Sequence, residues 1–507
     1  MLKKVLVAKI SAYNTFVKRC KVKKILCVLL VIFICMAATV CAFAACGSKK
    51  GEAHSSYDIF VIYDEEAKTL SGTVDFSFYN SSDNQLSDLK FNLYGNAFRE
   101  GAAYSPVSET YKNRAYYAGK SFGGMEITNV ENCAGWNVAG EDENILIVNL
   151  VEPVYPEQSV KIKISYTLTL AKVNHRTGVT ANTVNLGNFY PILCAYTKEG
   201  FIECPYYSCG DPFVSECANY SVTIDMPETY TAASSGVLQS ESVTDGRKKA
   251  QYKLQNARDF AIVLSDKFEV ISADADGVEV SYYYINDKNA EASLNAATES
   301  LKYFSQTFGS YIYPSLSVVE TGFCYGGMEY PALTMIASGQ SSAENIYTIV
   351  HENAHQWWYA MVGNNQLTCA WQDEGLAEYS TLMFFENNPD YGYTRSGIVL
   401  SATRSYRAFF SVYSQLKGEV DTSMTRNLGT FSNELEYSNI AYNKSLVMFD
   451  MLRSAVGNDR FVSCLKKYFK SWCGKIAPSE ALIAAFKAGG SSAEDMFSGF
   501  IDGKIII

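Results

Sequence analysis

Residues 57–285 show a repeated alternation of apolar and polar side chains. In the run 160–170, apolar residues occupy every second position. Shorter runs with the same period lie at 74–78, 220–226 and 278–282. A period of two gives a strand one buried and one solvent-facing side, as in an antiparallel sheet. The pattern predicts an N-terminal β-rich domain over 57–285, built as an antiparallel β-sandwich or saddle.

From about residue 287 the spacing of apolar residues changes to that of helices. The run 290–308 has apolar side chains at helical intervals, namely Leu294, Ala297, Leu301 and Phe304. Short apolar strands are expected next, at 316–320 and 332–336. The chain is therefore predicted to be a multidomain α+β protein, with a mainly helical domain at 286–507 after the β-rich one.

A helix start signal follows these two strands. Ser341 and Glu344 have the spacing of a capping box, which predicts a helix that begins there. Its apolar pattern continues to about Met361, and Gly363 is a suitable stop. Later helices are expected at 374–386, 440–456 and 461–472.

The first 46 residues predict a targeting or anchoring segment outside the fold. They hold eight basic residues and no acidic one, and the run 25–45 carries no charge. That run is just long enough to cross a bilayer as a helix, and the basic residues before it would keep the start of the chain in the cytoplasm. The rest of the protein would then lie outside the cytoplasm, attached to the cell membrane.

The end of this segment offers two means of attachment. The sequence Phe43-Ala-Ala-Cys46-Gly47 resembles a bacterial lipobox, with Phe43 where leucine is usual. We expect either a lipid on Cys46 or an uncleaved transmembrane signal-anchor helix. Residues 47–56 are small and polar, as expected of a tether.

Beyond residue 46 the chain is acidic and typical of a globular protein. It has 35 basic residues against 53 acidic ones there, and the whole chain is 48% hydrophobic. A body of this charge is repelled by nucleic-acid backbones, so nucleic-acid binding is not expected. The cysteines form no CxxC pair, so a cysteine zinc site is not indicated, and the disulfide pairing stays open.

The strongest chemical signal is His351-Glu352-Asn353-Ala354-His355. Side chains at positions i and i+4 of a helix project from one face, so both imidazoles can reach one metal ion. Glu352 lies between them, where its carboxylate can approach a water without binding the metal. The apolar surroundings, with Val350 and Trp357, argue against a solvated helix face.

A third metal donor is available on the next predicted helix. A catalytic zinc site has three protein ligands and one open position. Glu374 follows His355 after 18 residues, in the sequence Trp371-Gln-Asp-Glu-Gly-Leu-Ala-Glu378. Glu378, one turn later, is the competing carboxylate by residue type.

These motifs resemble the aminopeptidase N family of gluzincin metallopeptidases, which carries HExxH, 18 residues, and then Glu within WxxEGxA. The resemblance covers about 57–507 and implies a thermolysin-like zinc peptidase domain at 286–507. It also implies one Zn²⁺ per chain, held by His351, His355 and Glu374. Glu352 would be the base that activates the attacking water.

The segment Gly326-Gly327-Met328-Glu329-Tyr330 resembles the GAMEN motif of the same family. The resemblance implies that Glu329 binds the free amine of the substrate, while the backbone of Gly326, Gly327 and Met328 holds the peptide. Tyr330 stands where the family usually has asparagine. The family's second amine-binding residue is not identified, although 185–191 and 209–212 lie in the appropriate stretch.

Tyr442, in Ala441-Tyr-Asn-Lys-Ser445, is similar to the tyrosine of the family's YEKG-like segment. The resemblance implies that Tyr442 donates a hydrogen bond to the tetrahedral intermediate. Residue type alone also fits a core tyrosine packed with Phe449. Tyr437 is the alternative donor.

The sequence thus predicts a zinc-dependent aminopeptidase that removes N-terminal residues from peptides outside the cytoplasm. Two alternatives remain open. One is a thermolysin-like endopeptidase without selection for a free amine, and the other is a non-catalytic peptide-binding scaffold. N-acetylation of the substrate distinguishes the endopeptidase from the aminopeptidase, because only the aminopeptidase loses its activity when the amine is blocked.

Overall fold

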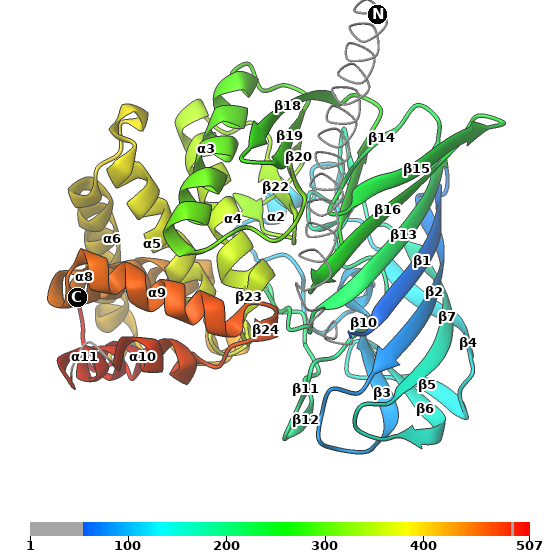
Figure 1. The fold of residues 1–507 in the computed structure, drawn as a ribbon, viewed down its shortest axis with the longest axis horizontal. Coiled ribbons are helices and arrows are strands. Elements are labelled where there is room, and N and C mark those ends of the chain that lie inside the picture. The colour runs from blue at the N-terminus through cyan, green and yellow to red at the C-terminus, as the bar shows by residue number, and fades with distance from the viewer. Residues whose placement is uncertain (1–53, 488–490) are drawn as a thin grey trace, which may run out of the picture. The chain divides into compact units, whose positions relative to one another are not determined.

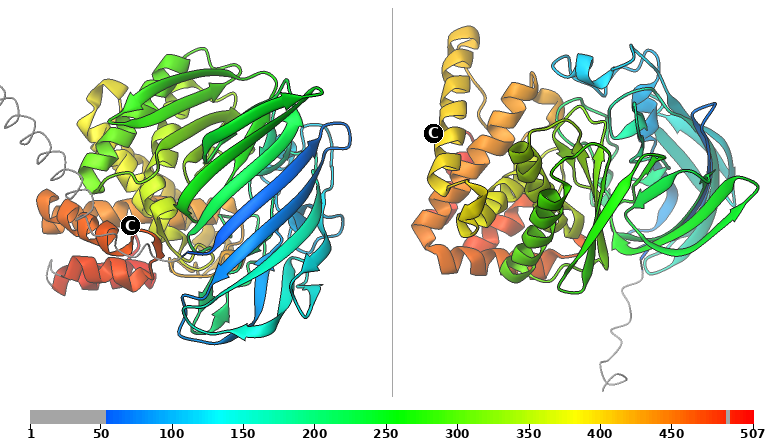
Figure 2. Two further views of the ribbon diagram at one scale, coloured as in Figure 1. Left: turned by 45° about the vertical axis from the view of Figure 1, so that its right-hand side comes forward. Right: turned by 90° about the horizontal axis from the view of Figure 1, so that it is seen from above.

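The computed structural model describes residues 54–487 and 491–507. The predicted anchor 1–46, including Cys46, lies outside the described residues, and so does most of the predicted tether. None of the helices in these two ranges is long and apolar enough to cross a bilayer. Figures 1 and 2 show the described part as β-sheets on one side and helices on the other.

The largest element is a seven-stranded sheet in the order β15-β16-β13-β1-β2-β7-β4. Neighbours are antiparallel, except that β1 and β13 are parallel. Buried and less buried residues alternate along β1 and β2, which is the predicted period of two. Its strands are β1 (Ser56–Asp64), β2 (Thr69–Tyr79), β4 (Gly124–Glu131), β7 (Ser159–Thr169), β13 (Ala218–Pro227), β15 (Val237–Thr244) and β16 (Arg247–Ala257).

A second sheet, in the order β10-β3-β6-β5, packs on the first. Phe76 of β2 meets Phe91 of β3 with ring centroids 5.4 Å apart, which makes this half a sandwich. The strands are β3 (Leu86–Asn92), β5 (Gly135–Ala139), β6 (Ile145–Val154) and β10 (Ile192–Leu193). Smaller strands are β8 (Thr177–Val179), β9 (Val184–Leu186), β14 (Thr231–Ser234) and β17 (Ile262–Ser265), with the hairpin β11 (Tyr196–Thr197) and β12 (Gly200–Phe201).

A five-stranded sheet, β18-β19-β20-β22-β21, leads into the helical half. The strand β19 pairs with β20 in parallel, so this sheet spans the predicted domain boundary at 285/286. A division there would separate paired strands, and the boundary stays a prediction. The strands are β18 (Glu269–Ala275), β19 (Val278–Tyr284), β20 (Ser315–Thr321), β21 (Gly327–Met328) and β22 (Leu333–Ala337).

The helical half has the predicted α3 (Ala290–Phe308) packed on β18, β19 and α4 (Ser342–Ala354). α5 (Ala370–Asn387) packs against α4 and α8 (Ser445–Val456). α6 (Arg395–Lys417) was not among the predicted helices. The remaining elements are α2 (Lys112–Ala115), α7 (Glu434–Tyr437), α9 (Asn458–Trp472), α10 (Ser479–Lys487), α11 (Ser491–Ile501), β23 (Val362–Gly363) and β24 (Lys475–Ile476). The predicted α+β class, with a β-rich half followed by a helical half, is confirmed.

α4 begins as predicted but ends early. Ser341 and Glu344 form the capping box. The helix was expected to continue to Met361, but it stops at Ala354, and a wide π-helical turn occupies Gln356–Met361. Trp358 and Tyr359 have non-helical backbone angles there. Both indoles of the pair 357–358 are buried with satisfied N–H groups, donating to Gly309 O and Ser380 Oγ, and the break orients them toward these acceptors.

Candidate metal centre and substrate cavity

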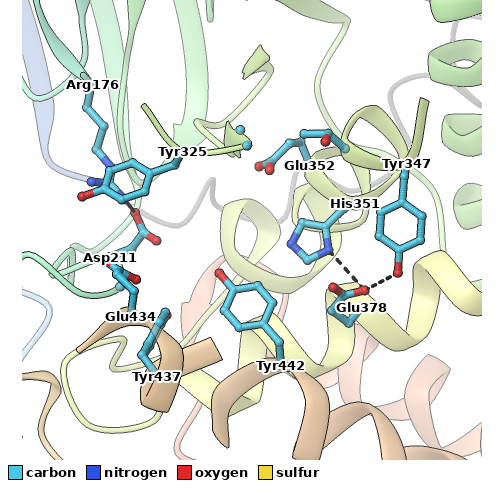
Figure 3. A pocket seen from close by; sticks show the side chains of 14 residues that line it. Arg176, Asp211, Tyr325, Tyr347, His351, Glu352, Glu378, Glu434, Tyr437 and Tyr442 are labelled. Atoms are coloured by element: carbon cyan, nitrogen blue, oxygen red, sulfur yellow. Dashed lines mark hydrogen bonds and ion pairs between the residues drawn. The ribbon is translucent and has the colours of Figure 1, made fainter. Parts of the chain in front are cut away.

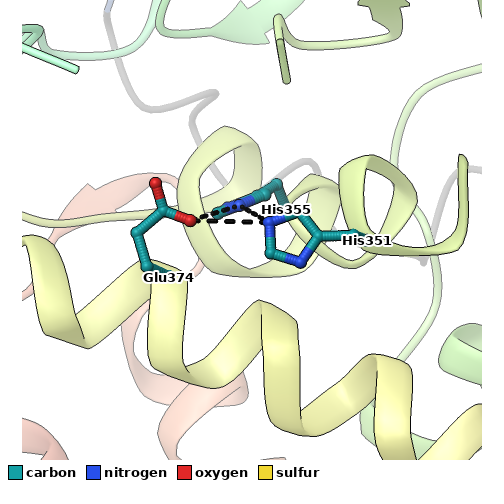
Figure 4. Close-up of side chains that lie close together, drawn as sticks. All are labelled: His351, His355 and Glu374. Carbon is teal, nitrogen blue, oxygen red and sulfur yellow. Dashed lines mark hydrogen bonds and ion pairs between the residues drawn. The ribbon is translucent and has the colours of Figure 1, made fainter. Parts of the chain in front are cut away.

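Three side chains converge where α4 meets α5 (Figure 4). His355 Nε2 lies 3.1 Å from His351 Nε2 and 3.2 Å from Glu374 Oε2. The distance from His351 Nε2 to the same carboxylate oxygen is 3.5 Å. Tetrahedral ligands at about 2.0–2.2 Å from a zinc ion are about 3.3–3.6 Å apart. The three predicted donors therefore fit a tetrahedral ion with a fourth position left open.

The break after α4 orients one of these imidazoles. His355 Nδ1 lies 3.2 Å from the carbonyl oxygen of Trp358, which the non-helical backbone turns toward the ring. A proton on Nδ1 donated to this carbonyl leaves Nε2 free to bind a metal. The shortened helix, which the sequence did not predict, thus supports the donor geometry.

Glu378, the competing ligand, lies on the other side of His351. Its Oε2 is 3.9 Å from His351 Nδ1 and accepts a hydrogen bond from the Tyr347 hydroxyl at 2.7 Å. It is thus placed at the imidazole nitrogen that faces away from the other donors. Of the two carboxylates considered, Glu374 is the one beside both histidines.

A second group of donors shares His355 with Glu329 and Asp373. Both oxygens of Asp373 are occupied, because Asn364 Nδ2 and Gln366 Nε2 donate to them at 2.9 and 2.7 Å. Gln366 also donates to Glu329 at 3.3 Å. The first group has the freer carboxylate oxygen and is the better metal site.

The charges around the donors favour a cation. Burial would raise the pKa of Glu374, but the neighbouring imidazoles outweigh it and hold that pKa well below its usual range. Burial raises the pKa of Glu352 well above its usual range, and the negative charge of Glu329 adds to the rise. A divalent ion between these groups would compensate the buried negative charge.

Glu352 faces an open space and is itself unsatisfied. Its Oε2 is buried and has no hydrogen-bond partner among the described residues. A Cβ atom at residue 327 would collide with the Glu352 carboxylate, so the position requires glycine. The strand β21 can therefore approach the candidate base closely.

A cavity of about 220 Å³ lies against the centre (Figure 3). One end, here called the metal end, has His351, Glu352 and Tyr442, with Tyr347 and Glu378 beside them. The opposite end, here called the Arg176 end, is lined by Arg176, Asp211, Tyr325, Glu434 and Tyr437. The volume is below the roughly 300–1,000 Å³ of pockets for drug-sized ligands, so its enclosed part suits about one residue of a peptide.

Both candidate tyrosines donate a hydrogen bond to the metal donor Glu374. The Tyr442 hydroxyl donates to Glu374 Oε1 at 2.5 Å, and the Tyr437 hydroxyl donates to the same oxygen at 3.4 Å. Tyr442 is the closer of the two. Lys444, by contrast, is buried and donates to the carbonyl oxygens of Thr422 and Phe500, so its role is structural.

The segment 326–330 forms one wall of the cavity. Gly326 and Gly327 line it, whereas Met328 is buried and its sulfur accepts a hydrogen bond from Arg176 Nε at 3.0 Å. Glu329 is buried near His355. The structure thus brings the predicted amine-binding carboxylate to the predicted metal donors.

Tyr330, the departure from the family motif, has a partner in the β-rich half. Its hydroxyl donates to Asn188 Oδ1 at 2.7 Å, and Asn188 Nδ2 donates to Asp259 at 2.7 Å. Any side chain at Gly187 would collide with the Tyr330 ring. A tyrosine at this position therefore links the segment 326–330 to the β-rich half by a hydrogen bond.

The residues of the Arg176 end were not identified from the sequence. Asp211 falls within the stretch 209–212 noted above, but Arg176 and Glu434 were not singled out. Arg176 forms a buried ion pair with Asp211, and its guanidinium lies 5.2 Å from the Tyr325 ring centroid. Arg176 and Asp211 come from separate loops and Glu434 from α7, so these residues have no local spacing that the sequence could reveal.

Comparisons with known proteins agree with this geometry. The model of the peptidase family M1 domain matches residues 292–500. Aminopeptidase M1-D of Oryza sativa subsp. japonica is 24% identical over 289 residues, which cover 53% of this chain and 32% of the relative. Leucine aminopeptidase 2 of Aspergillus fumigatus is 26% identical over 192 residues, covering 37% of this chain and 29% of the relative. The chain spans about a third of the length of these relatives.

A solved structure shares the fold over most of both chains. The M1 zinc metallopeptidase from Deinococcus radiodurans superposes with a TM-score of 0.63 at 18% sequence identity. The superposition covers 90% of this chain and 96% of that one. The β-rich half and the helical half therefore occur together in both proteins.

Proposed function

We propose that this chain is a zinc-dependent aminopeptidase of the aminopeptidase N family of gluzincin metallopeptidases, since its residues 292–500 match the peptidase family M1 domain. One observation carries the proposal. His351, His355 and Glu374 present three donors at metal-binding separations, beside a buried carboxylate that faces a cavity. Zinc, when bound there, supplies a Lewis acid that lowers the pKa of a water and polarises the scissile carbonyl.

Glu352 is the proposed general base. Its Oε2 has no partner among the described residues, so it is free to accept a proton from the attacking water. The same carboxyl then passes the proton to the leaving amine. Burial raises the pKa of Glu352 well above its usual range, which strengthens the carboxylate as the proton acceptor in the first transfer.

Tyr442 is the proposed stabiliser of the carbonyl oxygen as that oxygen gains negative charge. The hydrogen bond from its hydroxyl to Glu374 places the donor next to the metal donors. Burial raises its pKa well above the usual range, so the hydroxyl keeps its proton and can donate it as a hydrogen bond.

Glu329 and Asp211 are the proposed binding groups for the substrate's α-ammonium. Glu329 adjoins His355, and Asp211 faces the cavity from the β-rich half. Two carboxylates, one beside the metal donors and one lining the cavity, would hold a free amine and present only the first peptide bond to the metal. This arrangement favours an aminopeptidase over an endopeptidase.

One observation favours the alternative thermolysin-like endopeptidase. Asp211 is already paired with Arg176, which reduces its availability to an ammonium group. An endopeptidase would use the metal, Glu352 and Tyr442 alone. The two functions differ in their need for a free N-terminus.

A panel of aminoacyl reporters with free and N-acetylated amines tests the proposal on the full chain. We expect hydrolysis of the free-amine reporters only, and loss of that activity with a chelator. Equal cleavage of acetylated internal peptide bonds would support the endopeptidase instead. No hydrolysis of any reporter by zinc-loaded protein would be the result for a non-catalytic scaffold.

We also propose that the enzyme acts outside the cytoplasm, attached to the cell membrane by residues 1–46. The support is the basic start, the apolar run 25–45 and the lipobox-like sequence at Cys46. Radiolabelled palmitate should enter the wild-type chain and not a Cys46→Ala variant. Membrane attachment of both proteins without label would favour the uncleaved helix, and a cytoplasmic wild-type protein would refute the location.

A further inference from the structure

Glu434 lines the Arg176 end of the cavity, on the side away from His351 (Figure 3). It is the first residue of α7, and its Oε1 is buried without a hydrogen-bond partner among the described residues. No lysine, arginine or histidine nitrogen in the described part of the chain lies within ion-pair distance of it. A carboxylate oxygen buried in this state gains from a cation supplied by a ligand.

Arg176, the cation that lines the same end as Glu434, already has other partners. Arg176 pairs with Asp211, donates to the sulfur of Met328 and lies over the Tyr325 and Phe213 rings at 5.2 and 5.5 Å. These contacts fix the guanidinium against the wall. The Arg176 end therefore has one carboxylate more than it has cations.

We propose that Glu434 makes this enzyme select peptides whose first residue is lysine or arginine. The inference rests on the proposed aminopeptidase function, since it assigns the side-chain subsite of that same cavity. A first residue held by its amine near Glu329 extends its side chain into the remaining space, where Glu434 can pair with its terminal charge. The Tyr325 and Tyr437 rings line the same end, and aromatic faces also attract cations.

The electrostatics of Glu434 agree with this role. Burial raises its pKa to about 7, while the charge of Arg176 lowers it in part. A cationic side chain beside it would stabilise the ionised form and recover the energy lost by burial. An uncharged first residue offers no such compensation.

The experiment compares kcat/KM for arginyl, lysyl, alanyl, leucyl and glutamyl reporters with the zinc-loaded full chain. We expect the two cationic reporters to be preferred at least about tenfold, in keeping with the cost of leaving a buried charge unpaired. Glu434→Gln should reduce this preference to within about threefold, with little change for alanyl. Glu419→Gln removes the same charge from an exposed position and should leave the preference unchanged.

Two results separate the failure of this inference from the failure of the proposed function. Hydrolysis with an unchanged reporter preference in Glu434→Gln would overturn the inference and leave the aminopeptidase standing. If no reporter is hydrolysed, the preference for a cationic first residue can still be tested by calorimetric measurement of argininamide and alaninamide binding to the zinc-loaded protein. Tighter binding of argininamide that Glu434→Gln abolishes supports the inference, and equal binding of both amides overturns it.

Discussion

The two ends of the cavity bury charge in opposite ways. At the metal end, Glu352 and Glu374 are buried carboxylates, and Glu352 Oε2 has no hydrogen-bond partner within the described part of the chain. At the Arg176 end, Asp211 is buried against Arg176 within the protein. We expect the metal end to take up an ion from solution. At the Arg176 end, the charges of Arg176 and Asp211 compensate each other, and only the charge of Glu434 is left without a partner among the described residues. Neutral substitutions should therefore cost activity at the metal end, and folding stability where they break the Arg176–Asp211 ion pair.

The largest effect is expected from removal of a metal donor. His355→Ala takes away the imidazole that contacts both other donors, so zinc content should fall from about one ion per chain to near zero. Hydrolysis should decrease by more than the roughly 10⁴-fold upper limit of a lost general base. Metal analysis of folded, gel-filtered protein gives the measurement. A variant that keeps its zinc and its activity would contradict the assignment of the site.

Glu352→Gln should retain zinc and lose turnover. Removal of a general base costs about 10²–10⁴-fold in kcat. Steady-state kinetics beside metal analysis separates this result from loss of the ion. The chelated variant should also be at least as stable to urea as the chelated wild type, because the amide never has to bury a negative charge. Full activity in the zinc-loaded variant would remove Glu352 as the base.

Asp211→Asn should lower stability, besides removing one of the two carboxylates proposed to hold the substrate's ammonium group. It leaves the buried Arg176 without its partner, which costs about 3–5 kcal/mol of unfolding free energy. Urea denaturation measures the loss. In the matched double variant, Arg176→Met with Asp211→Leu, no buried charge remains, and we expect a smaller loss. Equal stability of Asp211→Asn and the wild type would show that the ion pair is not required.

Tyr442→Phe tests the donor at the metal end without changing its charge. Loss of one hydrogen-bond donor to a developing oxyanion typically lowers kcat by about 10²–10³-fold. KM should change little, because the interaction strengthens in the transition state. Tyr437→Phe is the matched control, since its hydroxyl is farther from Glu374. A larger loss of kcat in Tyr437→Phe than in Tyr442→Phe would assign the oxyanion donor to Tyr437 instead.

The smallest expected effect is a pH dependence of selectivity. Glu434, with a pKa near 7, is mostly neutral below that pH and ionised above it, while arginine stays charged. The ratio of kcat/KM for arginyl and alanyl reporters should rise by up to about tenfold from pH 6 to pH 8. The groups facing Glu434 are Arg176, Asp211, Cys209 and Ser108. The ratio in Glu434→Gln should be flat, and an equal slope there would assign the titration to another group.

The residues predicted for the metal end lie close together in the structure, and the sequence pattern that pointed to them is mostly local. His351, Glu352 and His355 lie within one helical turn, and the capping box that begins α4 spans four residues. α3 has the predicted bounds because its apolar side chains follow the helical period without interruption. In each case neighbours along the chain determine the structure.

The remaining features depend on contacts between distant segments. The apolar pattern of α4 continues past Ala354, but the helix ends there, and the two consecutive tryptophans that follow are both buried through contacts with distant segments. α6 was not identified because its buried stripe is sparse, with only Ala402, Tyr406, Phe409 and Tyr413. The Arg176 end joins residues 176, 211 and 434, which only the completed fold brings together.

The hydrogen bond from Tyr330 to Asn188 has a consequence for the autonomy of the helical half. A fragment beginning at residue 286 would still contain every metal donor, yet the residue after Glu329 would have lost its acceptor. The distance between the bound ion and the substrate's amine would then be free to vary. The helical half thus carries the residues for the chemistry, whereas the β-rich half, through Asn188, fixes how far from the ion the substrate's amine is held.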